Sequence, residues 1–182
     1  MRNRWILGCV VAAVALLCVT AGFSSAPQEG KAGKVRGIVT SDTILSGMIA
    51  SLLPPDRYRV EAVLPPGQCP GHYDVKLTDI EKMKKADLVV TFQGMPFMKT
   101  PGAGGQRVLL VDTEGRNWMA PDSYIYGLGV LADKLSKHFP EDKDGIMRRK
   151  EETIRRVNAG ANSLAQRIKQ AGLFGKAIIA SS

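Results

Sequence analysis

Strand-like runs alternate with helical segments along most of this chain, and the alternation restricts its fold more than any other feature. The expected strands are short and rich in β-branched or apolar residues, and they lie at 35–40, 58–64, 87–92 and 106–111. Helical patterns at 43–53 and from 78 to about 86 lie between the first three strands. Two parallel strands need a crossover connection between them, and a helix commonly supplies it. Strands that alternate with helices at this spacing therefore pair in parallel. The sequence therefore predicts an α/β fold, with a lobe built on a parallel four-stranded sheet with flanking helices.

Local signals predict where some of these elements begin and how they are covered. Ser41-Asp42 is expected to cap the first helix, and Thr78 with Glu81 three residues later has the spacing of a capping box. The apolar run Val108–Val111 predicts a strand that is covered on both faces.

A long helix is predicted after the lobe. One helix is expected at 122–138, Pro140 ends it, and a second runs over roughly 142–172. In the second helix, residues of one stripe recur at spacings of three and four: Ile146, Lys150, Ile154, Val157, Ala161, Leu164 and Ile168. At 1.5 Å per residue it spans about 45 Å, longer than a compact lobe requires, which favours a spine between two bodies.

The expected organisation is a lead-in at 27–34, a lobe at 35–140, a linking helix at 141–173, and the first strand of a missing second lobe at 174–182.

The amino terminus has the pattern of an export signal. Arg2 and Arg4 precede an uncharged apolar run from Trp5 to Phe23, and small residues follow it. We expect a signal peptide at 1–26 and a periplasmic or other extracytoplasmic location. The run approaches the length of a membrane span, so an uncleaved segment that anchors the chain is the alternative.

Charge and cysteine content exclude some functions. The formal net charge of +8 falls to +6 when Arg2 and Arg4 are removed from the 25 Lys and Arg and set against 17 Asp and Glu. This mild excess, mixed with acids, is typical of a solvated surface and not of a nucleic-acid-binding protein. Cys9 and Cys18 lie in the expected signal, so Cys69 is the only thiol after it and no disulfide forms within the exported chain. Metal binding, redox chemistry and simple burial remain open for Cys69.

The run Cys69-Pro70-Gly71-His72-Tyr73-Asp74 carries the candidate metal ligands. Pro70-Gly71 bends the chain, so that Cys69 and His72 are able to bind one ion, and Asp74 supplies an oxygen ligand or orients the imidazole. Sulfur with imidazole favours zinc or copper over manganese. We expect zinc or another divalent transition metal, weakly bound because only two or three ligands are present. Two alternatives remain: His72 is a solvated loop residue beside a buried Cys69, or Cys69 is the thiol of an oxidoreductase.

Four features in order resemble the cluster-nine family, the solute-binding proteins of zinc and manganese ABC transporters. They are a Pro-Pro-Gly loop after the second strand, the His-Tyr-acid run, a helix ending in Ala86-Asp87-Leu88-Val89, and the segment Trp118–Pro121 before two helices. The resemblance implies two α/β lobes that clasp a metal ion, delivery to ABC permease subunits, and no enzymatic activity. It places a family histidine near His72 and a second one at Arg116, which cannot bind a cation. A truncated remnant with little metal affinity is therefore an alternative.

The resemblance and the general geometry of α/β sheets also indicate residues that line the cleft. Gln93, Gly94 and Met95 follow the third strand, at the carboxyl edge where such sheets place ligands. Tyr73, Arg116 and Trp118 complete this set, although a packing role is the simpler interpretation of Trp118.

Overall fold

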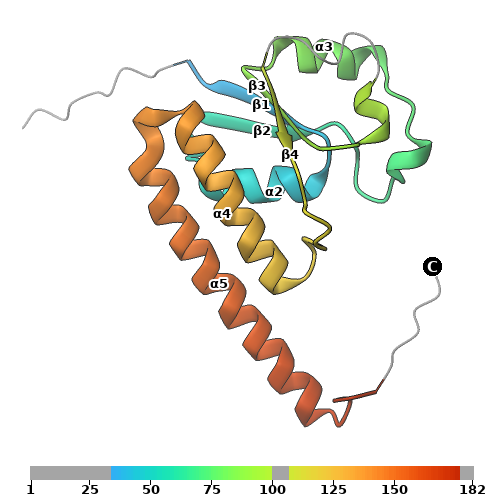
Figure 1. Ribbon diagram of the computed structural model, residues 1–182, viewed down its shortest axis with the longest axis vertical. Helices are drawn as coiled ribbons and strands as arrows, with labels where there is room; N and C mark the ends of the chain where they lie inside the picture. Colours follow the sequence, from blue (N-terminus) through green and yellow to red (C-terminus); the bar gives the residue numbers. More distant parts are fainter. Residues whose placement is uncertain (1–33, 100–106, 177–182) are drawn as a thin grey trace, which may run out of the picture. The chain divides into compact units, whose positions relative to one another are not determined.

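The computed structural model describes residues 34–99 and 107–176. The expected signal peptide, nearly all of the lead-in and the strand expected near 177–180 lie outside these residues. The elements in chain order are β1 (Arg36–Thr40), α2 (Thr43–Leu52), β2 (Tyr58–Ala62), η1 (Pro70–His72), α3 (Leu77–Lys85), β3 (Leu88–Phe92), η2 (Pro96–Lys99), β4 (Val108–Val111), α4 (Pro121–His138), η3 (Pro140–Asp142) and α5 (Lys143–Gln170) (Figure 1).

The strands form one parallel sheet in the order β2-β1-β3-β4. β1 pairs with β2 from Arg36 opposite Tyr58 to Thr40 opposite Ala62. All four carboxyl ends therefore lie at one edge of the sheet. The predicted α/β class, the parallel sheet and the long helix are confirmed.

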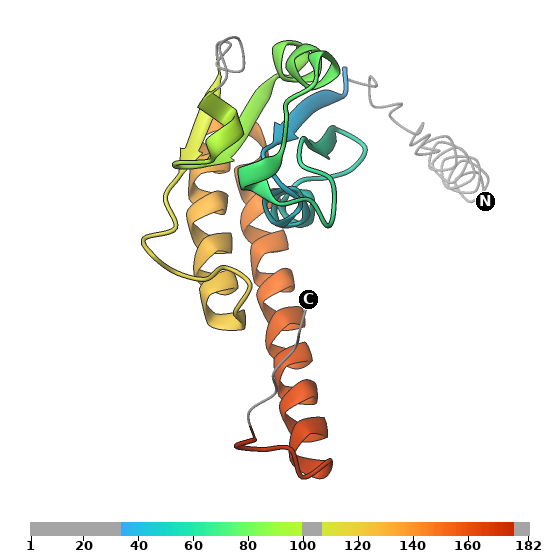
Figure 2. The same cartoon turned by 90° about the vertical axis from the view of Figure 1, so that its right-hand side faces the viewer.

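Helices cover the two sheet faces unequally. On one face, α2, α4 and the first turns of α5 bury the larger core with Ile38, Leu88 and Val90 (Figures 1 and 2). On the other face, α3 and η2 cover a smaller cluster around Val39 and Val89. Alternate residues of β1 and β3 enter opposite clusters, as the two-residue period of a strand requires.

The prediction that β4 is covered on both faces is wrong. β4 is an edge strand, and only its residues Leu109 and Val111 pack against the larger core. Val108 and Leu110 point to the other face, where among the described residues they are 39% and 56% exposed. An apolar run alone does not distinguish a central strand from an edge strand, because composition carries no information on strand order.

One of the two predicted helix caps is confirmed and the other is corrected. The Asp42 carboxylate accepts hydrogen bonds from the amides of Ile44 and Leu45 at 2.9 and 3.0 Å, as expected for the start of α2. α3 begins at Leu77, one residue before the predicted cap Thr78. Asp79, and not Glu81, reaches back to an amide, that of Lys76 at 3.0 Å.

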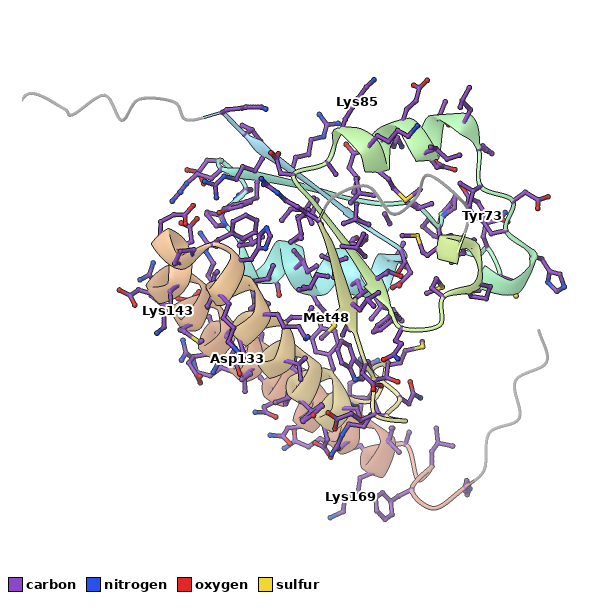
Figure 3. The ribbon with its side chains drawn as sticks, turned by 45° about the horizontal axis from the view of Figure 1, so that its top comes forward. Met48, Tyr73, Lys85, Asp133, Lys143 and Lys169 are labelled. Atoms are coloured by element: carbon purple, nitrogen blue, oxygen red, sulfur yellow. The ribbon has the colours of Figure 1, made fainter. Side chains whose placement is uncertain are left out.

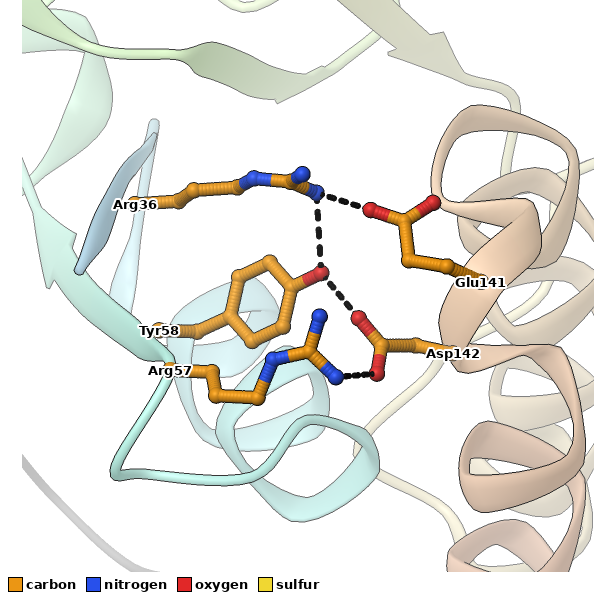
Figure 4. A network of polar contacts seen from close by, with 5 residues as sticks. All are labelled: Arg36, Arg57, Tyr58, Glu141 and Asp142. Atoms are coloured by element: carbon orange, nitrogen blue, oxygen red, sulfur yellow. Dashed lines mark hydrogen bonds and ion pairs between the residues drawn. The ribbon is translucent and has the colours of Figure 1, made fainter. Parts of the chain in front are cut away.

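A polar network fastens the α4–α5 turn to the start of the sheet (Figure 4). The buried Asp142 carboxylate accepts hydrogen bonds from the Tyr58 hydroxyl at 2.5 Å and from Arg57. Arg36 pairs with Glu141 at 2.5 Å and also reaches the Tyr58 oxygen at 3.3 Å. Burial and the neighbouring Asp142 raise the pKa of Tyr58 to about 12, because both disfavour the phenolate. The network fixes where α5 leaves the lobe.

The second half of α5 has few contacts with the rest of the described chain. Ile146 and Thr153 are buried, but from Asn158 to Lys176 every residue except Ala161 is exposed. Leu164 and Ile168, which continue the apolar stripe, are 55% and 36% exposed. Within the described ranges, no helix combines the length and the apolar character needed to cross a bilayer.

A glycine in α4 allows the helix to pack closely against Trp118. A Cβ atom on Gly127 would lie 2.8 Å from two carbons of the Trp118 ring and 2.9 Å from the Met48 methyl. We expect Gly127→Ala to lower the free energy of unfolding by about 1–3 kcal/mol, because the added methyl group overpacks this contact. This loss outweighs the gain in helix propensity that alanine brings. Urea unfolding of the purified protein measures this loss.

Gly129→Ala, two residues away in the same helix, is the matched control. A Cβ there meets nothing within 4 Å. The control should be stabilising by about 0.5–1 kcal/mol. Equal effects of the two substitutions would contradict the close contact at Gly127.

Candidate metal-binding loop

The loop that carries the candidate ligands leaves β2 at the carboxyl edge of the sheet. Its first residues remain tied to the end of β1 and the residue after it, because the Val63 amide donates to the Thr40 carbonyl at 2.8 Å and the Leu64 amide donates to the Ser41 carbonyl at 3.0 Å. The chain then turns at Pro65-Pro66-Gly67, where Gly67 has φ +80°. A positive φ favours glycine, so the predicted Pro-Pro-Gly turn is present.

Cys69 and His72 lie at the two ends of a single tight turn. Residues Pro70–His72 form η1, and the His72 amide donates to the Cys69 carbonyl at 3.1 Å. Both side chains are exposed. The alternative in which Cys69 is a buried small residue is therefore wrong: the turn presents the thiol to solvent.

Tyr73 anchors this turn to the body of the lobe (Figure 3). Its hydroxyl donates to Asp79 Oδ2 at 2.8 Å, and its ring meets Phe97 of η2 edge to face, with centroids 5.4 Å apart. Burial, reinforced by the contact with Asp79, raises the pKa of Tyr73 to about 12. Asp79 is 6% exposed and also holds the Lys76 amide. Tyr73 thus supports the loop instead of offering its oxygen to a ligand.

The three candidate ligands do not form a closed site. Cys69, His72 and Asp74 are all exposed, and none of them has a hydrogen bond through its side chain to another described residue. In the described ranges, no group of three or more His, Cys, Asp or Glu side chains is placed to hold a metal ion. Metal binding by these residues stays a prediction, and it needs either a rearrangement of the loop or ligands from elsewhere.

Arg116 lies in the loop between β4 and α4, held by an aromatic ring. Its guanidinium carbon lies 4.3 Å from the centroid of Tyr126, which is one turn inside α4. The Tyr126 hydroxyl donates a hydrogen bond to the Glu114 carboxylate, and this bond is the first of the causes that raise the pKa of Tyr126. Glu114 itself has φ 51°, and its amide donates to the Asp112 carboxylate at 2.8 Å. The arginine is exposed but restrained, so the loop presents a fixed positive charge.

Trp118 is part of the core. It is 3% exposed, and its ring meets Phe92 edge to face with centroids 5.1 Å apart. The packing interpretation of Trp118 is confirmed, and its ring does not line an open surface. Its Nε1 is buried with no hydrogen-bond partner among the described residues.

The residues after β3 differ from one another in exposure. Gln93 and Gly94 are exposed, and the Gln93 amide donates to the Val111 carbonyl at 2.8 Å. Gly94 has φ +81°, which makes the turn that follows the strand. Met95 is half-buried against the smaller cluster. Gln93 and Gly94 are thus placed at the carboxyl edge, and Met95 contributes to packing.

Two anchors near these loops were missed by sequence reasoning. The role of Asp79 could be predicted, since an acid at the third position of a helix commonly accepts a hydrogen bond from the amide of the residue that precedes the helix. The role of Tyr126 could not, because its contact with Arg116 depends on how the β4–α4 loop folds back on the helix.

Comparisons with known proteins reveal a structural likeness. No protein-family model matches the sequence, and no curated protein matches it. The fold does match solved structures. The Zn(II)-bound ZnuA-like domain of Streptococcus pneumoniae AdcA superposes with TM-score 0.58 at 17% identity, over 69% of this chain and 52% of that one. The fold is that of one lobe of a ZnuA-like protein.

Two further structures of this kind show the same likeness. The Mn-bound periplasmic metal-binding protein from candidatus Liberibacter asiaticus gives TM-score 0.63 at 15% identity, over 74% of this chain and 57% of that one. The metal-dependent lipoprotein YcdH of Bacillus subtilis gives 0.57 at 17% identity, over 68% and 52%. This chain therefore spans between half and three fifths of the length of these ZnuA-like chains, and at such identities the likeness establishes the fold.

Proposed function

We propose that this protein is an extracytoplasmic carrier, without catalytic activity, that binds a divalent transition metal for delivery to an ABC permease. The observation that carries the proposal is the match of its fold to one lobe of zinc- and manganese-bound ZnuA-like structures. Zinc is the favoured ion, because Cys69 and His72 offer sulfur and imidazole nitrogen.

The geometry of the loop supports this function in two ways. The η1 turn exposes a thiol and an imidazole three residues apart at the carboxyl edge of a parallel sheet, where α/β folds bind ligands. The Tyr73–Asp79 hydrogen bond restrains the same loop, so that the ligands need less ordering when an ion binds.

The thiol oxidoreductase is the weaker alternative. A redox-active cysteine of the thioredoxin type is followed directly by a long helix, whose amino terminus stabilises the thiolate. Here Cys69 is followed by the three-residue η1, and no other cysteine lies in the described residues. The remnant hypothesis differs from the proposal only in affinity, so it is decided by measuring zinc binding.

Zinc protection of the Cys69 thiol tests the proposal. Zinc should slow alkylation of Cys69 in the purified protein, because a metal-bound thiolate is no longer available to the reagent. His72→Ala should remove most of this protection, whereas His138→Ala, at the end of α4, should leave it unchanged. Equal labelling rates with and without zinc would remove Cys69 from the site.

A further inference from the structure

A small pocket lies on the sheet face that α3 only partly covers, away from the candidate metal loop. Its volume is about 190 Å³, and β1 contributes Gly37, Ile38 and Val39 to its floor. Gly37 is central to it, because a Cβ atom built there would meet nothing within 4 Å. The absent side chain therefore leaves open space above the strand.

Three cationic side chains stand around this pocket, although much of the surface that lines it is apolar. Arg59 comes from β2, and Lys82 and Lys85 come from α3 (Figure 3 labels Lys85). One acid, Glu61, stands among them and pairs with Arg59 at 2.6 Å and with Lys82 at 3.8 Å. None of the ion pairs between described residues involves Lys85. The Glu61 carboxylate thus pairs with two of the three cations, and the lining has an excess of two positive charges.

Size and charge together define what fits. Pockets for drug-sized ligands have volumes of about 300–1,000 Å³, so this one accepts only a small ion with a few waters. A second carboxylate, that of Asp87, accepts the Gly37 amide at 2.8 Å and is not part of the lining. From these observations we propose that the pocket between β1, β2 and α3 binds a phosphate-sized oxyanion. The ion contacts Lys85 and Lys82, while Arg59 remains paired with Glu61.

This site is independent of the proposed metal function. The metal loop follows β2 at the carboxyl edge of the sheet, whereas Gly37 and Arg59 lie at the beginning of their strands. The metal-free protein is therefore used for the test, and His72→Ala should leave oxyanion binding unchanged.

The test is a titration of the ¹⁵N-labelled, metal-free protein with inorganic phosphate, followed by amide chemical shifts. We expect saturable shifts at Gly37, Arg59 and Lys85 with a dissociation constant on the order of millimolar. Sulfate should compete, and sodium chloride at equal ionic strength should produce no saturable shift. Shifts that chloride reproduces, or that spread over all surface lysines, would overturn the proposal.

Two variants and one matched control sharpen the result. Gly37→Val fills the floor with a side chain suited to a strand, and Lys85→Glu reverses the charge of the unpaired wall residue; each should weaken binding by about tenfold or more. Lys84→Glu makes the same charge change on the same helix outside the lining and should change affinity by less than about twofold. If Gly37→Val does not fold, Lys85→Glu against Lys84→Glu still decides. Equal weakening by the two lysine variants would contradict a defined site.

Discussion

Asp142→Ala should lower the free energy of unfolding by about 3 kcal/mol, the largest effect we expect from a single polar side chain in this protein. The carboxylate is 8% exposed and accepts hydrogen bonds from Tyr58 and Arg57. Removing it leaves the hydroxyl of the buried Tyr58 facing only the guanidinium of Arg36, which is also a donor. Urea denaturation at pH 7, followed by circular dichroism, measures the loss.

Glu141→Ala is the control for this variant. Glu141 is the preceding residue and also pairs with an arginine, but the side chains of Glu141 and Arg36 are 41% and 38% exposed. Exposed ion pairs contribute little, so the loss should be much smaller than that of Asp142→Ala. Similar small losses in both variants would mean that the Asp142 network does not hold the α4–α5 turn to the sheet.

Asp79→Ala should both destabilise the lobe and loosen the candidate metal loop. The variant removes the acceptor of the Tyr73 hydroxyl and of the Lys76 amide, so two donors lose their partner at the start of α3. We expect a loss of about 2 kcal/mol. We also expect faster amide hydrogen exchange over residues 69–76, because Tyr73 no longer ties the loop to the helix. Denaturation and hydrogen exchange by mass spectrometry measure the two effects.

Glu81→Ala separates the observed cap from the one predicted by sequence. Glu81 is exposed on the same helix and makes no hydrogen bond that starts α3. Its removal should change stability by less than about 0.5 kcal/mol. A loss in Glu81→Ala equal to that in Asp79→Ala would show that Thr78 and Glu81 form the cap after all.

The regular elements of this fold were predictable because their signals are local. β-branched runs and three-four spacings indicate strands and helices directly, and α2 begins at Thr43 after the Asp42 cap, as the sequence indicates. The alternation of strands and helices then implies a parallel sheet. What remained hidden was strand order, and with it the exposure of Val108 and Leu110 on the edge strand β4.

Contacts between distant residues were not predictable from one sequence. Tyr58 and Asp142 are separated by 84 positions, and nothing near either residue indicates the other. The same holds for the contact of Tyr73 with Phe97, which restrains the loop after β2, and for the contact of Arg116 with Tyr126, which restrains the β4–α4 loop. The composition of the candidate site was readable in the Cys69–Asp74 run, but the exposure of Cys69 depends on how the loop packs.

Zinc calorimetry on the purified protein, with His72→Ala and Arg116→His, is the most direct test of metal binding. The described residues supply at most three candidate ligands from one open loop, so zinc should bind with a dissociation constant on the order of micromolar or weaker, well short of structural zinc sites. His72→Ala should weaken binding further, because it removes the imidazole. The family resemblance places a ligand histidine at position 116. If Arg116 faces the cleft as that resemblance implies, Arg116→His should strengthen binding, because it exchanges a positive charge for a neutral ligand. Unchanged affinity in both variants would contradict the proposed site, and sub-nanomolar binding by the unaltered protein would contradict its open, weakly binding geometry.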